Sequence, residues 1–200
     1  LFPADQSVNA ELSTATLEDV NEAIEKADQA WRQPSWRNSL PHERARILYK
    51  VADIIEARVD ELAKLQTRDN GKPLTETRGL VMSAAATARY VAAACETLND
   101  ELTTQRAPDF MTMSVHEPVG VVAAITPWNS PIASEVQKLA PALAAGNAVV
   151  LKPAEATSLI ALELAKIFEE AGLPKGLLSV LVGRGSVIGD AIAQHPLVRS

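Results

Sequence analysis

The sequence predicts an α/β protein in which a helical first part precedes a Rossmann-like, parallel βαβαβ sheet. Charge is the first observation: residues 119–200 carry six of the 19 basic and six of the 25 acidic side chains, so residues 1–118 carry the other 13 and 19. Secondly, apolar side chains recur every three or four positions in the first part, as in amphipathic helices. Thirdly, short β-branched runs alternate with helical segments in the second part, which is typical of parallel strands joined by right-handed crossovers.

The composition is that of an ordinary globular protein, with 47% hydrophobic and 22% charged residues among 200. A net charge of -6 disfavours a nucleic-acid partner, because phosphate binding needs a basic face. A single cysteine leaves no internal disulfide and predicts a cytoplasmic protein. One cysteine and three scattered histidines predict no metal site, and no apolar run has the length of a membrane helix.

Three helices are expected in the first part. Residues 16–31 begin with Thr16 and Asp19, which resemble a capping box with Asp in place of Glu or Gln. Residues 41–69 form the second helix, because their apolar positions keep helical spacing up to a terminal Asn-Gly pair. An alanine-rich helix follows over residues 74–99, and its small side chains permit close packing against a neighbour.

Two residues of this part that could carry chemistry, Cys95 and His116, are interpreted as structural. Cys95 lies at an apolar position of the third helix, where a small buried hydrophobe is a better interpretation than a nucleophile. Residues 110–118 alternate in polarity, which predicts a strand of a hairpin or an edge ribbon. His116 is therefore expected at the surface or opposite a neighbouring strand.

The second part contains the sheet. Strands are expected over residues 119–126, 148–152 and 177–182, and helices over residues 131–145, 158–171 and 186–194. Parallel sheets of this kind bind ligands beyond the carboxyl ends of their strands. The segments to examine are therefore those that follow each strand: Thr126–Pro131, Lys152–Glu155 and Gly183–Gly189.

The turn after the first strand carries Asn129 between two prolines. One interpretation makes its amide an oxyanion donor held in a rigid turn, and the other makes it an Asx turn or a helix cap. After the second strand, Lys152 and Glu155 would hold the phosphate and hydroxyls of a nucleotide, or would form a solvated pair at a helix start. After the third strand, the pattern Gly183-x-Gly185-x-x-x-Gly189 would admit a pyrophosphate at a helix N-terminus, or would be a plain turn.

Several motifs together resemble the aldehyde dehydrogenase superfamily along essentially the whole chain. They are Asp69–Leu74, His116–Val121, Thr126–Pro131, Leu151–Glu155, and Ala171–Pro174 followed by Gly183-x-Gly185. The resemblance implies NAD(P)-dependent oxidation of an aldehyde to a carboxylic acid. In such enzymes a cysteine thiolate attacks the aldehyde, the asparagine that matches Asn129 holds the oxyanion, and a glutamate activates the water that releases the acid.

The resemblance also implies the cofactor-binding residues. They are Ile125, Thr126, Pro127, Trp128, Asn129, Lys152, Pro153, Ala154, Glu155, Gly185, Ser186 and Gly189. Among them, Lys152 and Glu155 would contact the adenosine ribose. NAD is the expected cofactor, because the carboxylate of Glu155 would repel a 2′-phosphate, although use of NADP stays open.

The nucleophilic cysteine and the catalytic glutamate of the family match positions beyond residue 200, so the fold is expected to be incomplete at the C-terminus and the chain alone inactive. The expected division is a helical part of the cofactor domain over residues 1–102, a strand of an oligomerisation arm over 103–118, and the NAD-binding part over 119–200. The full-length enzyme is expected to be a homodimer or homotetramer acting on a small aldehyde. A non-catalytic homologue that binds nucleotide or only oligomerises, and an enzyme that passes the acyl group to coenzyme A, are the alternatives.

Overall fold

A computed structural model describes all 200 residues. The helices are α1 (Leu17–Trp31), α2 (Pro34–Arg37), α3 (Pro41–Ala57), α4 (Val59–Asn70), α5 (Leu74–Thr97), α6 (Pro131–Ala144), α7 (Leu159–Glu170) and α8 (Asp190–Gln194), with a π-helical turn, η1 (Gly185–Gly189), before α8. The strands are β1 (Glu101–Leu102), β2 (Met113–Ser114), β3 (Val121–Ile125), β4 (Ala148–Lys152) and β5 (Leu178–Val180). The α/β class and the parallel βαβαβ run are therefore confirmed.

Local signals at the helix ends act as the sequence predicts. Thr16 and Asp19 form a capping box at the start of α1, with Thr16 N 2.7 Å from the Asp19 carboxylate. Gly71 ends α4 with φ +78°, a left-handed conformation that other residues rarely adopt. Gly146 takes the same role after α6 with φ +85°.

The prediction of a single helix over residues 41–69 is wrong, because the helix is interrupted at Arg58. This residue leaves the helical conformation with φ -109° and ψ 21°, and α4 starts anew at Val59. The Arg58 guanidinium donates to Glu61 at 2.5 Å and to Glu163 of α7 at 2.6 Å. The bend lets α4 reach α7 while α3 runs along α5.

The sheet has the order β5-β4-β3, with all three strands parallel. After α8 the chain returns to the other side of β3, where Val198 pairs with Val121 and Ser200 O accepts from Ala123 N at 2.7 Å. The chain thus builds the sheet first to one side of β3 and then to the other, which places the topological switch point at the carboxyl end of β3.

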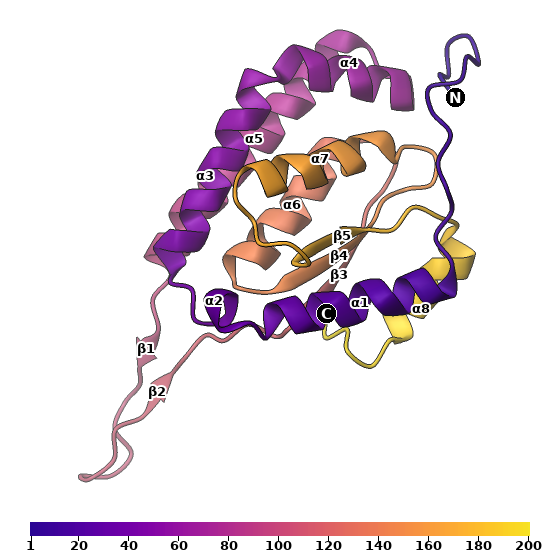
Figure 1. The fold of residues 1–200 in the computed structure, drawn as a ribbon. Helices are drawn as coiled ribbons and strands as arrows, with labels where there is room; N and C mark the ends of the chain where they lie inside the picture. Colours follow the sequence, from indigo (N-terminus) through magenta and orange to yellow (C-terminus); the bar gives the residue numbers. More distant parts are fainter.

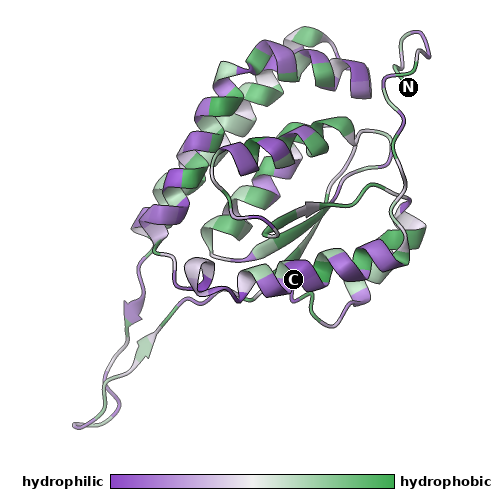
Figure 2. Cartoon of the chain, viewed as in Figure 1, coloured by the Kyte–Doolittle hydropathy of each residue, from purple (hydrophilic) through white to green (hydrophobic).

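The elements lie in layers (Figure 1). Helices α6 and α7 cover one face of the sheet, with α3, α4 and α5 beyond them, and α1 and α8 lie on the other face. One hydrophobic cluster of 40 buried residues runs through these layers and includes all of β4 except Lys152. The strands of the parallel sheet are mostly apolar and the outer helices are two-sided in hydropathy (Figure 2), as burial of a parallel sheet on both faces requires.

A narrow hairpin projects from the body (Figure 1). Its strands β1 and β2 pair antiparallel, Glu101 with Ser114 and Leu102 with Met113. The predicted ribbon is confirmed, but the strand expected over residues 110–118 shrinks to two residues, because the hairpin packs against nothing that would order a longer ladder. No helix combines the length and the apolar composition that crossing a bilayer requires.

Candidate functional site

Three turns meet at the carboxyl edge of the sheet. Ile125, the last residue of β3, pairs in register with Lys152, the last residue of β4. Leu151 pairs with Val180 of β5 in the same way. Because the strands are parallel, the turns that follow them start side by side, and the residues predicted after each strand gather at one edge.

Asn129 presents a free amide at this edge. Its side chain is exposed and makes no hydrogen bond. The N-cap of α6 is Ser130, whose side chain makes no capping bond, and Pro131 occupies the first helical position. The Asx-turn and helix-cap interpretations of Asn129 are therefore not realised, and its amide N–H groups stay available to a partner outside the protein.

Lys152 is buried, with 5% of its surface exposed. Its Nζ donates to the carbonyl oxygen of Pro153 at 2.8 Å. Burial lowers the pKa of Lys152, and the negative charge of Glu155 partly offsets this shift. A cation held in place but lacking an ion pair is suited to receive hydroxyl or phosphate oxygens of a ligand.

Glu155 does not pair with Lys152. Its carboxylate is exposed and lies 3.6 Å from Nε of Arg184, which follows β5. It also precedes the first residue of α7 by four positions, so the interpretation as a pair at a helix start is wrong. The pair of Glu155 and Arg184 bridges the turns after β4 and β5, and its exposure makes it a weak interaction.

The three glycines after β5 differ in what they accommodate. A Cβ on Gly183 would lie 3.0 Å from Ile188 Cδ1 and 3.1 Å from Thr14 Cγ2, so a larger residue here would have to displace these side chains. A Cβ on Gly185 or Gly189 would meet only the Lys152 side chain, at 3.8 and 4.0 Å, which is ordinary contact. Neither has a positive φ. The protein itself therefore needs no glycine at these two positions.

The continuous helix expected over residues 186–194 is wrong. The chain first makes the π-helical turn η1, in which Val187 N and Ile188 N both donate to Arg184 O at 3.0 Å, and only then enters α8. The wider turn buries Ile188 in the core and leaves Ser186 exposed. The turn begins and ends with a glycine, which has no side chain to contribute to a hydrophobic pattern, so helical periodicity could not predict the interruption.

The remaining predicted residues surround these groups. Thr126 is buried and its N–H donates to Lys152 O at 3.2 Å, which joins the first two turns. Ile125, Pro127 and Trp128 are exposed. Ala154 O accepts from Ser158 Oγ at 3.0 Å, which shapes the turn after β4. A hollow of about 240 Å³ at this edge is bordered by Glu155 and Gly183, among others.

Sequence reasoning missed two residues that shape the edge. Arg184 lies between Gly183 and Gly185, and no hydrophobic periodicity in this turn indicated where its side chain would lie. Gln66 of α4 is fully buried, and its Oε1 accepts from Ile132 N at 3.1 Å. A polar residue on the apolar face of a predicted helix was the available signal for Gln66.

Cys95 lies away from this edge, in a hollow of about 410 Å³ that Arg44 and His116 also line. It is half-buried rather than fully buried as expected, and its Sγ donates to Ala144 O at 3.3 Å. Burial raises the pKa of the thiol more than the nearby Arg44 guanidinium lowers it, which disfavours the reactive thiolate. His116 is exposed, as expected, with Nδ1 3.0 Å from Asp100 at the base of the hairpin.

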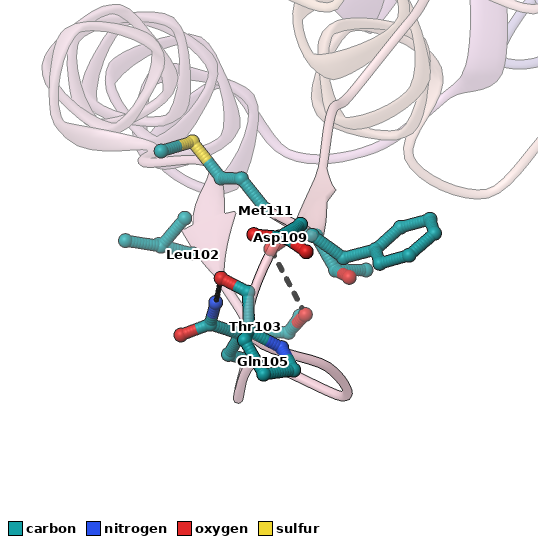
Figure 3. A pocket seen from close by; sticks show the side chains of 8 residues that line it. Leu102, Thr103, Gln105, Asp109 and Met111 are labelled. Carbon is teal, nitrogen blue, oxygen red and sulfur yellow. Dashed lines mark hydrogen bonds between the residues drawn. The ribbon is translucent and has the colours of Figure 1, made fainter.

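Another hollow, of about 360 Å³, lies within the hairpin (Figure 3). Leu102, Thr103, Gln105, Asp109 and Met111 line it, and the bonds drawn there close the hairpin loop on itself. It is formed by one exposed ribbon and contains none of the predicted site residues. The edge of the sheet is therefore the candidate site.

The amino-acid sequence matches the model of the aldehyde dehydrogenase family over residues 1–200. This chain belongs to the aldehyde dehydrogenase family. Phenylacetaldehyde dehydrogenase of Pseudomonas fluorescens is 45% identical over 202 residues, which cover 98% of this chain and 40% of that protein. The crystal structure of betaine aldehyde dehydrogenase from Staphylococcus aureus in complex with NAD+ has a TM-score of 0.96 and 35% identity, and covers 99% of this chain and 39% of that one.

A variant of the same Staphylococcus aureus enzyme without the cofactor is equally similar, with a TM-score of 0.96. The family resemblance seen in the motifs is thus confirmed in sequence and in fold. The present aldehyde dehydrogenase chain spans about 40% of the length of the relatives it matches. It brings Asn129, Lys152, Glu155, Gly185 and Gly189 to one edge of its sheet.

Proposed function

We propose that the protein containing this chain oxidises an aldehyde to a carboxylic acid with NAD, and that these 200 residues supply the NAD site and the oxyanion donor. The observation that carries the proposal is the register of Ile125 with Lys152, which sets the turn of the free Asn129 amide beside a buried, unpaired cation. The names of the two relatives, a phenylacetaldehyde and a betaine aldehyde dehydrogenase, support an aldehyde as the substrate.

In the proposed reaction a cysteine thiolate adds to the aldehyde carbon and the carbonyl oxygen becomes an oxyanion. The amide of Asn129 donates to that oxygen as its charge develops, which stabilises the transition state more than the ground state. Loss of hydride from the same carbon gives a thioester, and NAD, when bound, accepts the hydride. Attack by water on the thioester then releases the acid and restores the thiolate, with loss of a proton.

We infer that the nucleophile and the water-activating glutamate are not among these residues. Cys95 is the one cysteine of the chain, its thiol pKa is raised by burial, and it lies in a hollow between α3, α5 and α6 rather than at the sheet edge. The chain alone would then bind NAD without turning over an aldehyde.

The NAD site is proposed to run from Ile125–Asn129 through Lys152–Glu155 to Gly185, Ser186 and Gly189. Glycines that the protein does not need for its own packing leave room for a ligand to approach the backbone over the Lys152 stem. The NAD-bound relative supports this cofactor. Glu155 would disfavour a 2′-phosphate, while Arg184 beside it would soften that repulsion, so we propose NAD preference with weaker use of NADP.

We also propose that residues 103–118 form part of an oligomerisation arm beside the cofactor-domain segments 1–102 and 119–200, as in a homodimer or homotetramer. Large apolar side chains on this ribbon are exposed: Phe110, Met111, Met113 and Val115, with Leu102 directly before it. A ribbon that packs against nothing in its own chain, yet carries such side chains, is suited to a partner surface.

The lone cysteine fits a reducing, cytoplasmic location.

The experiment expresses the whole open reading frame that contains these residues and measures NADH formation with phenylacetaldehyde, betaine aldehyde and an aliphatic aldehyde. We expect aldehyde-dependent NADH formation with at least one class, and a higher kcat/KM with NAD than with NADP. The isolated 200 residues are expected to bind NAD in equilibrium dialysis without turnover. NADH formation only when coenzyme A is added would identify the acylating alternative, and none under either condition would contradict the proposal in favour of a non-catalytic homologue.

Exchange of Gly189 for alanine separates ligand binding from folding. Gly189 has helical φ -64° and ψ -48°, so Gly189→Ala is expected to leave the free energy of unfolding unchanged or to raise it by about 0.5–1 kcal/mol. The new methyl group stands where we place the cofactor, and the Kd for NAD should rise about tenfold. Denaturation and equilibrium dialysis measure the two effects.

Gly183→Ala is the matched control. Its Cβ meets Ile188 and Thr14 at close range, so this variant is expected to lose roughly 1 kcal/mol of stability and to bind NAD normally once folded. An unchanged Kd in Gly189→Ala would place the cofactor elsewhere.

A further inference from the structure

The turn that carries Asn129 is anchored at its two ends. At the start, Thr126 N donates to the backbone oxygen of Lys152 at 3.2 Å. At the end, Ile132 N donates to the side-chain Oε1 of Gln66 at 3.1 Å. The first anchor is part of the parallel ladder, whereas the second depends on one side chain from α4.

Gln66 provides the cap that α6 lacks. The N-cap residue, Ser130, makes no side-chain bond, and Pro131 has no N–H. Ile132 thus carries the first backbone N–H of α6, and this donor is one of those that a helix cannot satisfy within itself. Gln66 satisfies it from 66 positions away in the sequence.

The bond to Ile132 is the one hydrogen bond that the Gln66 side chain makes. The side chain is 0% exposed, and its Nε2 has no hydrogen-bond partner. A buried amide with one half unpartnered destabilises a fold, by about 1–3 kcal/mol. An apolar residue would avoid this cost but would leave the buried N–H of Ile132 without its acceptor, so the glutamine is retained where it holds the first turn of α6.

Asn129 has no support of its own. Its side chain makes no hydrogen bond and is exposed, so its position follows from the backbone of the turn alone. Two residues, Ser130 and Pro131, separate it from Ile132. An oxyanion donor must be held close to its working geometry, because a displacement of about 1 Å can reduce a rate on the order of 100-fold.

We propose that Gln66 is a positioning residue for Asn129: by holding the first turn of α6 it fixes the amide that receives the oxyanion. This inference rests on the proposed role of Asn129. It assigns to Gln66 no contact with substrate or cofactor, since its side chain lies beneath the turn among α4 and α6. We therefore expect its effect to fall mainly on turnover and only slightly on NAD binding.

The test compares kcat and the KM for NAD in the complete enzyme. Gln66→Met keeps the length of the side chain and removes the acceptor, and kcat is expected to fall about tenfold while the KM for NAD stays within about twofold. In an Asn129→Ala background the same exchange is expected to lower kcat less than about twofold, because the donor that it positions is absent. If Gln66→Met does not fold, Gln66→Asn, which withdraws the oxygen from Ile132, takes its place with the same expectations.

Thr77→Val is the control for a general loss of buried hydrogen bonds. Thr77 is equally buried, and its Oγ1 bonds only within α4 and α5, to Thr67 and to Leu74 O. It should destabilise the protein without lowering kcat. The inference is overturned if kcat in Gln66→Met is unchanged, if the loss is as large without Asn129, or if Thr77→Val lowers kcat equally. An unchanged kcat in Asn129→Ala would instead overturn the oxyanion role itself, whatever Gln66→Met does.

Discussion

Asn129→Ala should lower kcat by roughly 100- to 1000-fold, the usual effect of removing one oxyanion donor. The amide has no partner within the protein, so its loss leaves no buried group unsatisfied, and stability should be unchanged within about 0.5 kcal/mol. The KM for NAD should change much less than kcat, because Lys152 and the glycines of the proposed NAD site are untouched. Steady-state kinetics on the complete enzyme measure both constants.

Asn99→Ala is the matched control for this prediction. Asn99 is likewise exposed and makes no side-chain hydrogen bond, but it lies at the base of the hairpin. Its exchange should change neither kcat nor KM. A kcat in Asn129→Ala within a few-fold of the parent would refute the assigned role, and an equal fall in both variants would point to a general effect on assembly.

Glu135→Gln should make the protein more stable above neutral pH. Glu135 of α6 is 0% exposed and neither carboxyl oxygen has a hydrogen-bond partner. Burial raises the pKa of Glu135 to about 8, and the charge of Asp69 on α4 adds to this. The Asp69 carboxyl is itself buried, and its pKa is raised to about 6 although it accepts from Leu159 N.

The sign follows from proton binding. Between the ordinary pKa of about 4.5 and the raised pKa of about 8, the unfolded chain has lost the Glu135 proton and the folded chain keeps it. Stability that is present below this range is therefore lost as the pH rises. The wild-type chain should lose on the order of 3 kcal/mol between pH 5 and pH 8 through this group.

Urea denaturation at several pH values measures the effect. Glu135→Gln should flatten the decline, leaving the smaller contribution of Asp69, which acts in the same direction. Glu170→Gln, at an exposed position of α7 without an ion pair, should run parallel to the wild type. Parallel profiles for wild type and Glu135→Gln would mean that the folded protein holds the Glu135 carboxylate ionised.

Much of the fold follows from local signals. The glycines after α4 and α6 end these helices with positive φ, and the β-branched run at 148–152 is buried along its whole length. The bend at Arg58 was not predictable, because helical periodicity continues through it and the guanidinium is held by Glu163, far along the chain. The return of the chain to β3 is likewise a non-local pairing, which no window of sequence contains.

The candidate site divides in the same way. Parallel strands imply that their following turns share an edge, so the positions of Asn129 and Lys152 could be predicted from strand ends alone. The pairing of Glu155 with Arg184 could not, since a nearer cation, Lys152, was the obvious partner in the sequence. Gln66 could not be linked to Ile132 either, because their contact depends on how α4 crosses the start of α6.

The register of Ile125 with Lys152 has a consequence for how such an enzyme diversifies. The turn that carries Asn129 starts from a strand end that lies one step of the backbone ladder, about 4.8 Å, from Lys152. No side chain sets this spacing, so substitutions on the surrounding helices can leave it unchanged, and under the proposed function the coenzyme would stay aligned. The backbone register of the sheet therefore keeps the spacing between the two turns constant, while the side chains of the surrounding helices can differ between relatives.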